Sequence, residues 1–212
     1  MAFSVLTTVV SLVGQLQNST PAEVSEKTRY LQITLMNMSS NQRVEVKDSW
    51  FDCGRFWPPQ PFGSIPPGSS KTFFVCNKDF AMFTGVSGGI GLRVYDNDSA
   101  EPFTSDGKDW WICTFSSPYV GANKCLTRWK DFGICPLWDQ MEVAHHVTDT
   151  HCGCYQKEAN HMIFIWKDAS SNWWIFNISI FIIRIYLMLL WTSTLCFFIF
   201  KVFCCVNMVL PL

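Results

Sequence analysis

The chain has 212 residues, of which 49% are hydrophobic and 16% are charged, and its formal net charge is −1. Soluble chains usually carry about 25% charged residues, so this composition excludes disorder and a coiled coil, and without a basic excess it does not fit a nucleic-acid binder. Only Arg184 and Lys201 are charged after residue 172. The front of the chain is therefore ordinary soluble sequence, and its end is membrane-like.

The N-terminal segment, residues 1–17, is predicted to form an amphipathic helix. Its apolar stripe at helical spacing consists of Phe3, Leu6, Val9, Val10, Val13 and Leu16. No Lys or Arg precedes the stripe, unlike in a typical signal peptide. The residues alone fit a helix packed on its own domain, a membrane-seeking helix or a weak signal peptide.

Between Arg29 and Trp138 the chain is predicted to consist of short strands separated by turns. Leu31, Ile33 and Leu35 alternate with more polar residues, which is the period of a half-buried strand. Further strands at similar spacing, with no helical period between them, indicate an all-β sandwich over residues 27–143.

Seven of the ten cysteines precede the hydrophobic end of the chain, and four Asn-X-Ser/Thr sequons accompany them. This combination favours a secretory compartment and some disulfides. The spacing assigns no pairing, and buried thiols in a reduced protein are an equal alternative.

Residues 144–172 contain clustered His and Cys and are predicted to be a linker. The apolar run over 173–200, with Arg184 as its only charge, is longer than the roughly 20 residues that cross a bilayer, so it is a candidate transmembrane helix. Residues 144–212 are then either a membrane anchor or the translation of non-coding sequence.

Catalytic signatures are missing from the sequence, and we expect no enzyme, no cofactor and no metal ion. The only metal-like grouping is His145, His146, His161 and the run His151-Cys-Gly-Cys154. Its Cys-X-Cys spacing is not that of a zinc site, and no second Cys pair follows.

Several segments in chain order resemble the actinoporin-like pore-forming proteins, the sea anemone cytolysins and their fish and mollusc relatives. Residues 3–14 resemble the family's N-terminal helix, and Trp50-Phe-Asp-Cys-Gly54 resembles its aromatic strand ending in Ser-Gly. Phe115-Ser-Ser-Pro-Tyr119 is similar to its Phe-Ser-X-Pro-Phe/Tyr signature. The resemblance covers residues 3–143.

The resemblance implies a secreted hemolytic toxin that binds choline-headed lipid, often sphingomyelin, at the target-cell membrane. Its N-terminal helix then inserts and assembles an oligomeric, ion-permeable pore. The residues that match the headgroup pocket or lie near its positions are Cys53, Ser116, Pro118, Tyr119, Trp129 and Trp138.

The chain also departs from the family pattern. Residues 124–128 replace its Tyr/Trp run, residues 138–143 replace its Tyr cluster, and the N-terminal helix lacks acidic residues. The alternative is a non-lytic, lipid- or glycan-binding sandwich that a C-terminal transmembrane helix anchors as a single-pass protein.

Overall fold

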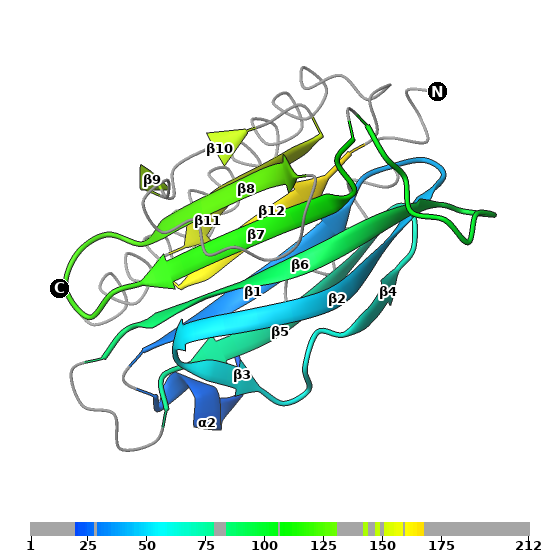
Figure 1. Ribbon diagram of the computed structural model, residues 1–212. Helices are drawn as coiled ribbons and strands as arrows, with labels where there is room; N and C mark the ends of the chain where they lie inside the picture. The colour runs from blue at the N-terminus through cyan, green and yellow to red at the C-terminus, as the bar shows by residue number, and fades with distance from the viewer. Residues whose placement is uncertain are drawn as a thin grey trace, which may run out of the picture. The chain divides into compact units, whose positions relative to one another are not determined.

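A computed structural model describes the chain over residues 20–27, 29–78, 84–105, 107–130, 142–143, 147–148, 151–158 and 160–167. All of these lie in the first of two compact units, residues 1–169. They form two packed β-sheets, so the predicted all-β sandwich is confirmed (Figure 1). The predicted helix over 1–17 and the apolar run over 173–200 lie outside the described residues. Within the described ranges, no helix is long and apolar enough to cross a membrane.

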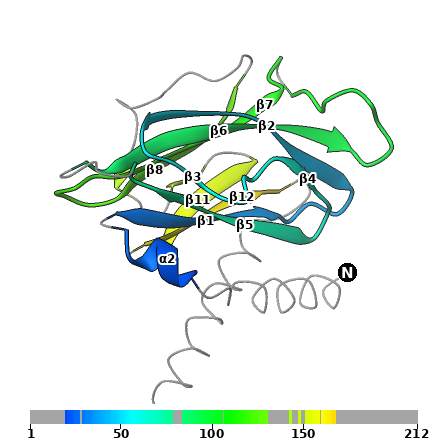
Figure 2. The ribbon, with the colours of Figure 1, turned by 90° about the horizontal axis from the view of Figure 1, so that it is seen from below.

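The first sheet, sheet A, has six strands in the order β10-β11-β12-β1-β5-β3. Neighbouring strands are antiparallel except β1 and β12, which run parallel. A short helix, α2 (Ala22–Ser25), precedes β1 and lies beside it in Figure 2. The strands are β1 (Tyr30–Asn37), β3 (Arg55–Trp57), β5 (Ser69–Cys76), β10 (Val147–Thr148), β11 (Cys152–Glu158) and β12 (His161–Trp166).

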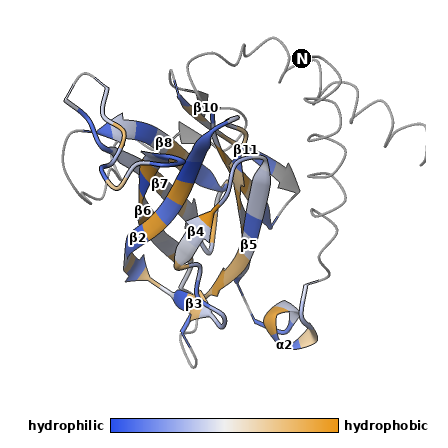
Figure 3. Cartoon of the chain, turned by 90° about the vertical axis from the view of Figure 1, so that its right-hand side faces the viewer, coloured by the Kyte–Doolittle hydropathy of each residue, from blue (hydrophilic) through white to orange (hydrophobic). Residues whose placement is uncertain are grey.

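The second sheet, sheet B, also has six strands, in the order β4-β2-β6-β7-β8-β9, and all its pairs are antiparallel. Its long strand β2 alternates buried and more exposed residues over its first half. Figure 3 shows hydrophobic and hydrophilic residues along the same strand. The strands are β2 (Gln42–Cys53), β4 (Gly63–Ile65), β6 (Val86–Asp96), β7 (Trp110–Ser117), β8 (Lys124–Lys130) and β9 (Glu142–Val143).

The predicted linker over 144–172 is wrong where the structure places β10, β11 and β12. All six residues of β12 are buried, so this strand has no polar face and lacks the alternation by which exposed strands are recognised. It pairs with β1 in the middle of sheet A. The sandwich therefore continues beyond residue 143 as far as Trp166.

The core between the sheets contains a cluster of aromatic rings at one level. The Trp166 ring centroid lies 5.0 Å from that of Trp129 and 5.8 Å from that of Trp111. Within sheet B, Trp111 Nε1 of β7 donates a hydrogen bond to Thr127 Oγ1 of β8 at 2.7 Å. Between the sheets, Trp166 Nε1 of β12 donates to Gln42 Oε1 of β2 at 3.1 Å. These bonds fix the rings without leaving the two donors unsatisfied.

Candidate functional site

Three small polar side chains form a row across sheet B, near the ends of β2 and β7. Strand register places Cys53 opposite Ser87, and Ser87 opposite Ser116. Their neighbours Val86 and Ser117 point into the core, so alternation turns Ser87 and Ser116 to the outer side of the sheet, where Ser116 is partly exposed and Ser87 is only 8% exposed. We call Cys53, Ser87 and Ser116 the outer row.

Hydrogen bonds connect the outer row to its surroundings. Cys53 Sγ lies 3.1 Å from Ser87 Oγ and 3.3 Å from the carbonyl oxygen of Gly85. Ser87 Oγ donates to Asp52 Oδ2 at 3.2 Å. The ladder shifts register between Phe51 and Cys53, which leaves Asp52 exposed beside the row.

Two glycines bring the neighbouring loops close to the outer row. A Cβ on Gly85 would lie 2.4 Å from the carbonyl oxygen of Ser117 and 2.8 Å from Cα of Pro118. Gly54 has φ +100°, and a Cβ there would lie 2.9 Å from the carbonyl oxygen of Cys76. Only glycine fits such close backbone approaches, so the sequence holds the start of β6 against the loop that follows β7.

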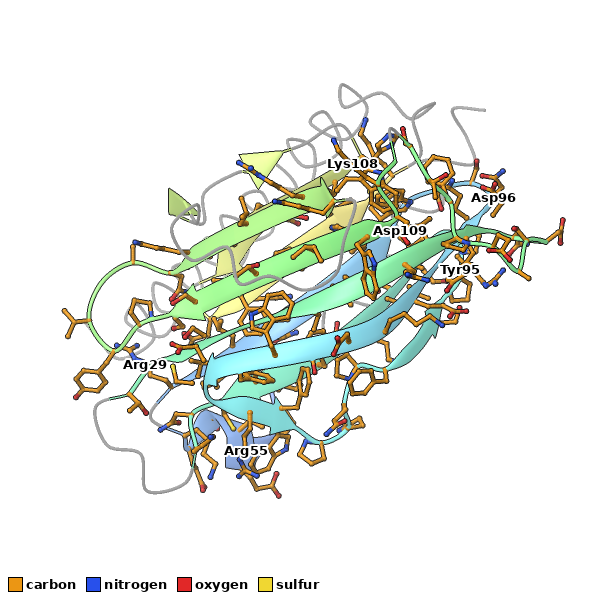
Figure 4. All side chains as sticks on the ribbon, in the orientation of Figure 1. Arg29, Arg55, Tyr95, Asp96, Lys108 and Asp109 are labelled. Atoms are coloured by element: carbon orange, nitrogen blue, oxygen red, sulfur yellow. A yellow bond between two sulfur atoms is a disulfide. The ribbon has the colours of Figure 1, made fainter. Side chains whose placement is uncertain are left out.

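A cation and an aromatic ring lie at the same end of the sandwich. Arg29 Nη2 donates to the carbonyl oxygen of Tyr119 at 2.5 Å, and its guanidinium carbon lies 5.6 Å from the centre of the Tyr119 ring. Figure 4 shows Arg29 at the end where β7 finishes. The next residue, Val120, is 82% exposed at the tip of the loop. Arg29 thus fixes a loop whose tip is apolar and open to solvent.

More positive charge lies on the adjoining strands of sheet A. Arg55 and Tyr30 both pair with Cys76, so Arg55 lies one residue position away from the level of Arg29. The Lys27 amino group and the Arg55 guanidinium lie 5.4 Å and 5.8 Å from the Trp57 ring centre. Figure 4 shows Arg55 below the end of β2.

The structure brings together only part of the site predicted from sequence. Cys53 and Ser116 lie in the outer row, and Pro118 and Tyr119 follow directly in the adjacent loop. Trp129 does not lie in this site, because the residue is only 6% exposed and its ring packs in the core against Trp166. Strand alternation explains this, because Cys125, Thr127 and Trp129 all face inward. Trp138 lies outside the described residues.

Sequence analysis missed Ser87 and Arg29. Ser87 joins the site only through the register of β2, β6 and β7, and Arg29 reaches Tyr119 across 90 positions of the chain. Neither relation leaves a local sequence signal. Across the described part of the chain, no group of three or more His, Cys, Asp or Glu side chains is arranged to hold a metal ion.

Comparison with known proteins gives structural likenesses only. No family model and no curated protein matches the chain. The structure is similar to IP-1A from Alcaligenes faecalis (15% identity, 68% of this chain and 94% of that one, TM-score 0.39) and to RahU in complex with TRIS (12%, 68% and 98%, 0.40). It is also similar to the lipid-binding protein Nakanori (10%, 78% and 79%, 0.46). With TM-scores below 0.5, these likenesses assign neither a family nor a function.

Proposed function

We propose that this protein binds choline-headed phospholipid, of the sphingomyelin type, at the end of the sandwich that carries the outer row. The observation that carries the proposal is the juxtaposition of the outer row with the Arg29–Tyr119 pair. One end of the molecule thereby offers a hydroxyl donor, a guanidinium, a carboxylate and an aromatic ring.

These groups match a zwitterionic headgroup. The hydroxyl of Ser116 and the Arg29 guanidinium suit phosphate oxygens, whereas Ser87 is only 8% exposed and donates to Asp52. The exposed carboxylate of Asp52 and the ring of Tyr119, a residue that is 36% exposed, suit a quaternary ammonium. Val120 at the exposed tip suits the apolar side of a membrane interface.

We further propose that lipid binding lets the apolar stripe of residues 1–17 insert and assemble an oligomeric pore after secretion. The cross-sheet disulfide between Cys125 and Cys154 supports an oxidising compartment. The second candidate is a non-lytic lipid- or glycan-binding module on a C-terminal anchor. The burial of Trp129 favours it, because that side chain supplies no aromatic wall to the headgroup site.

The first test measures binding of the full-length protein to vesicles of phosphatidylcholine and sphingomyelin by co-sedimentation. We expect Ser116→Leu to reduce the partition constant by about tenfold or more, because it replaces the hydroxyl donor with a larger apolar side chain. The matched control is Ser64→Leu, which alters an exposed serine of β4 in the same sheet. Equal losses in both variants, or no binding by the wild type, would contradict the proposal.

The second test separates the two candidates by dye release from the same vesicles. A pore-forming protein releases dye, and deleting residues 1–17 abolishes release while co-sedimentation persists. Binding without any release identifies the non-lytic module. Vesicles of phosphatidylethanolamine or phosphatidylglycerol show whether the choline group is required.

A further inference from the structure

Among the residues that the structure describes, four cysteines lie in the interior between β7–β8 and β11. Cys125 of β8 and Cys154 of β11 are joined by a disulfide, with their Cα atoms 6.9 Å apart. At this level the two sheets approach closely enough for a covalent link. Cys113 of β7 and Cys152 of β11 are thiols, and neither is accessible to solvent.

The registers place Cys113 and Cys152 one level away from that disulfide. Within sheet B, Phe115 pairs with Cys125, and Cys113 pairs with Thr127. Cys113 Sγ accordingly lies 3.9 Å from Thr127 Oγ1. Within β11, Cys152 and Cys154 are two residues apart, so their side chains leave the same face of the strand.

Contacts between the sheets show which way β11 runs past β8. Cys154 meets Cys125, while His151 meets Trp129, their ring centres 6.4 Å apart. Residue numbers therefore rise along β11 in the direction in which they fall along β8. Two residues before Cys154, Cys152 faces Thr127, which lies two residues after Cys125 and pairs with Cys113. The pKa of the Cys113 thiol agrees with this position: burial raises it well above its usual range, and the charge of Cys152 raises it further.

We propose that Cys113 and Cys152 are a second cross-sheet disulfide site, which closes beside Cys125–Cys154 when the protein equilibrates with an oxidised low-molecular-weight thiol. In glutathione disulfide, one cysteine thiolate attacks a sulfur, forms a mixed disulfide and releases one glutathione thiolate. The second cysteine thiolate displaces the other glutathione. One glutathione disulfide is reduced to two glutathione molecules, and the protein dithiol is oxidised to a disulfide.

Burial controls how fast the site closes. Both sulfurs are shielded, and the thiolate, which is the reacting form, is disfavoured at Cys113. Reaction therefore requires β11 to move away from β8 or takes place while the sandwich is still folding. Two bonds at adjacent levels would then hold sheet A to sheet B.

Peptide mapping of the full-length protein tests the site. The protein is equilibrated with glutathione and glutathione disulfide, alkylated under denaturing conditions and digested with trypsin without reduction. Three tryptic peptides carry the relevant residues: 109–124 with Cys113, 125–128 with Cys125, and 131–157 with Cys135, Cys152 and Cys154. Because Cys135 shares a peptide with Cys152, linkage of 109–124 is assigned to Cys152 only through the Cys152→Ser variant. We expect one species in which two disulfides join all three peptides.

Two variants make the assignment specific. In Cys152→Ser, peptide 109–124 should appear alkylated and unlinked, while 125–128 stays joined to 131–157. The matched control is Cys76→Ser, which removes a buried thiol from β5 and should leave the three-peptide species intact. An alkylated, unlinked 109–124 in the oxidised wild type overturns the proposal, and so does linkage of that peptide in Cys152→Ser.

Discussion

Gly89 is a packing position rather than a turn residue. A Cβ on Gly89 would lie 2.2 Å from Cζ2 and 2.3 Å from Cη2 of the Trp50 ring. The indole of β2 therefore rests directly on the backbone of β6, where the two residues are paired in register. Glycine is otherwise unfavourable within a strand, and here the close approach of a ring explains it.

Gly89→Ala should destabilise the protein by about 1–3 kcal/mol, because the methyl group must displace the Trp50 ring. The measurement is urea unfolding followed by circular dichroism. In a Trp50→Ala background the same substitution should cost much less, since the ring is gone. Additive costs in that double-mutant cycle would show that Gly89 acts through something other than Trp50.

The ion pairs of Glu45 should make the free energy of unfolding depend slightly on pH in the acidic range. A hydrogen bond from Lys47, with a further one from Arg43, holds the pKa of the Glu45 carboxyl below its usual 4.5 despite partial burial. A carboxyl with a lowered pKa in the folded state stabilises the protein above the unfolded pKa. That contribution is lost as pH falls below 4.5 and through the folded pKa.

Between about pH 6 and about pH 3, the free energy of unfolding should therefore fall less in Glu45→Gln than in the wild type. The difference should stay under ~1 kcal/mol, since the Lys47 side chain is 41% exposed and solvent screens the pair. Urea titrations at both pH values measure it. Parallel losses in the two proteins would exclude Glu45 as a contributor.

At the scale of the elements, Asn37 organises the end of β1. Its Nδ2 donates to the carbonyl oxygens of Gln42 at 2.6 Å and Ile65 at 3.0 Å, and its Oδ1 accepts from the Ser39 hydroxyl at 2.6 Å. One buried amide thus ties a strand of sheet A to the first residue of β2 and to β4. At this end of the sandwich the Asn37 side chain therefore links the two sheets by hydrogen bonds.

Asn37→Ala should cost about 2–4 kcal/mol, because it leaves several buried polar groups without partners. Asn41→Ala is the matched control, since that side chain is exposed in the same turn, and it should change stability by less than about 0.5 kcal/mol. Chemical unfolding of both variants gives the comparison. Similar losses of stability in the two variants would contradict the special role assigned to the Asn37 side chain.

Sequence reasoning found strand β1 from its alternating apolar residues and missed β12, whose sequence does not alternate. Alternation in Leu31, Ile33 and Leu35 marks β1, and all three are in the core. The uniformly buried β12 shows no such period. Of the site, the sequence supplied Cys53, Ser116 and the following loop. It could not supply Ser87 or the inward turn of Trp129, because both follow from long-range register.

At the scale of the whole molecule, the described core ends with β12. Phe164 and Trp166 of β12 are fully buried in this core, and the neighbouring strand β11 is joined to β8 by the Cys125–Cys154 disulfide. The sandwich should therefore need the chain as far as residue 167 and not the segment beyond residue 169.

A chain ending at residue 169 should retain one cooperative urea transition with native-like near-ultraviolet circular dichroism from its buried tryptophans. A chain ending at residue 150 should lose both, because it lacks β11 and β12. Loss of cooperativity in the longer product would show that residues 170–212 contribute to the stability of the sandwich.

The parallel pairing of β1 with β12 also sets the order of events during synthesis. Thr34 of β1 and His161 of β12 meet at 2.9 Å although 127 positions separate them in the chain. Closing so long a loop costs entropy that local contacts cannot recover, so contacts of this kind form late and slow the folding reaction. Strand β1 leaves the ribosome early and must wait for its partner until nearly the whole sandwich has been made. During that interval the edge of β1 that later pairs with β12 lacks its partner strand, so its backbone N–H and C=O groups are open to pairing with another chain.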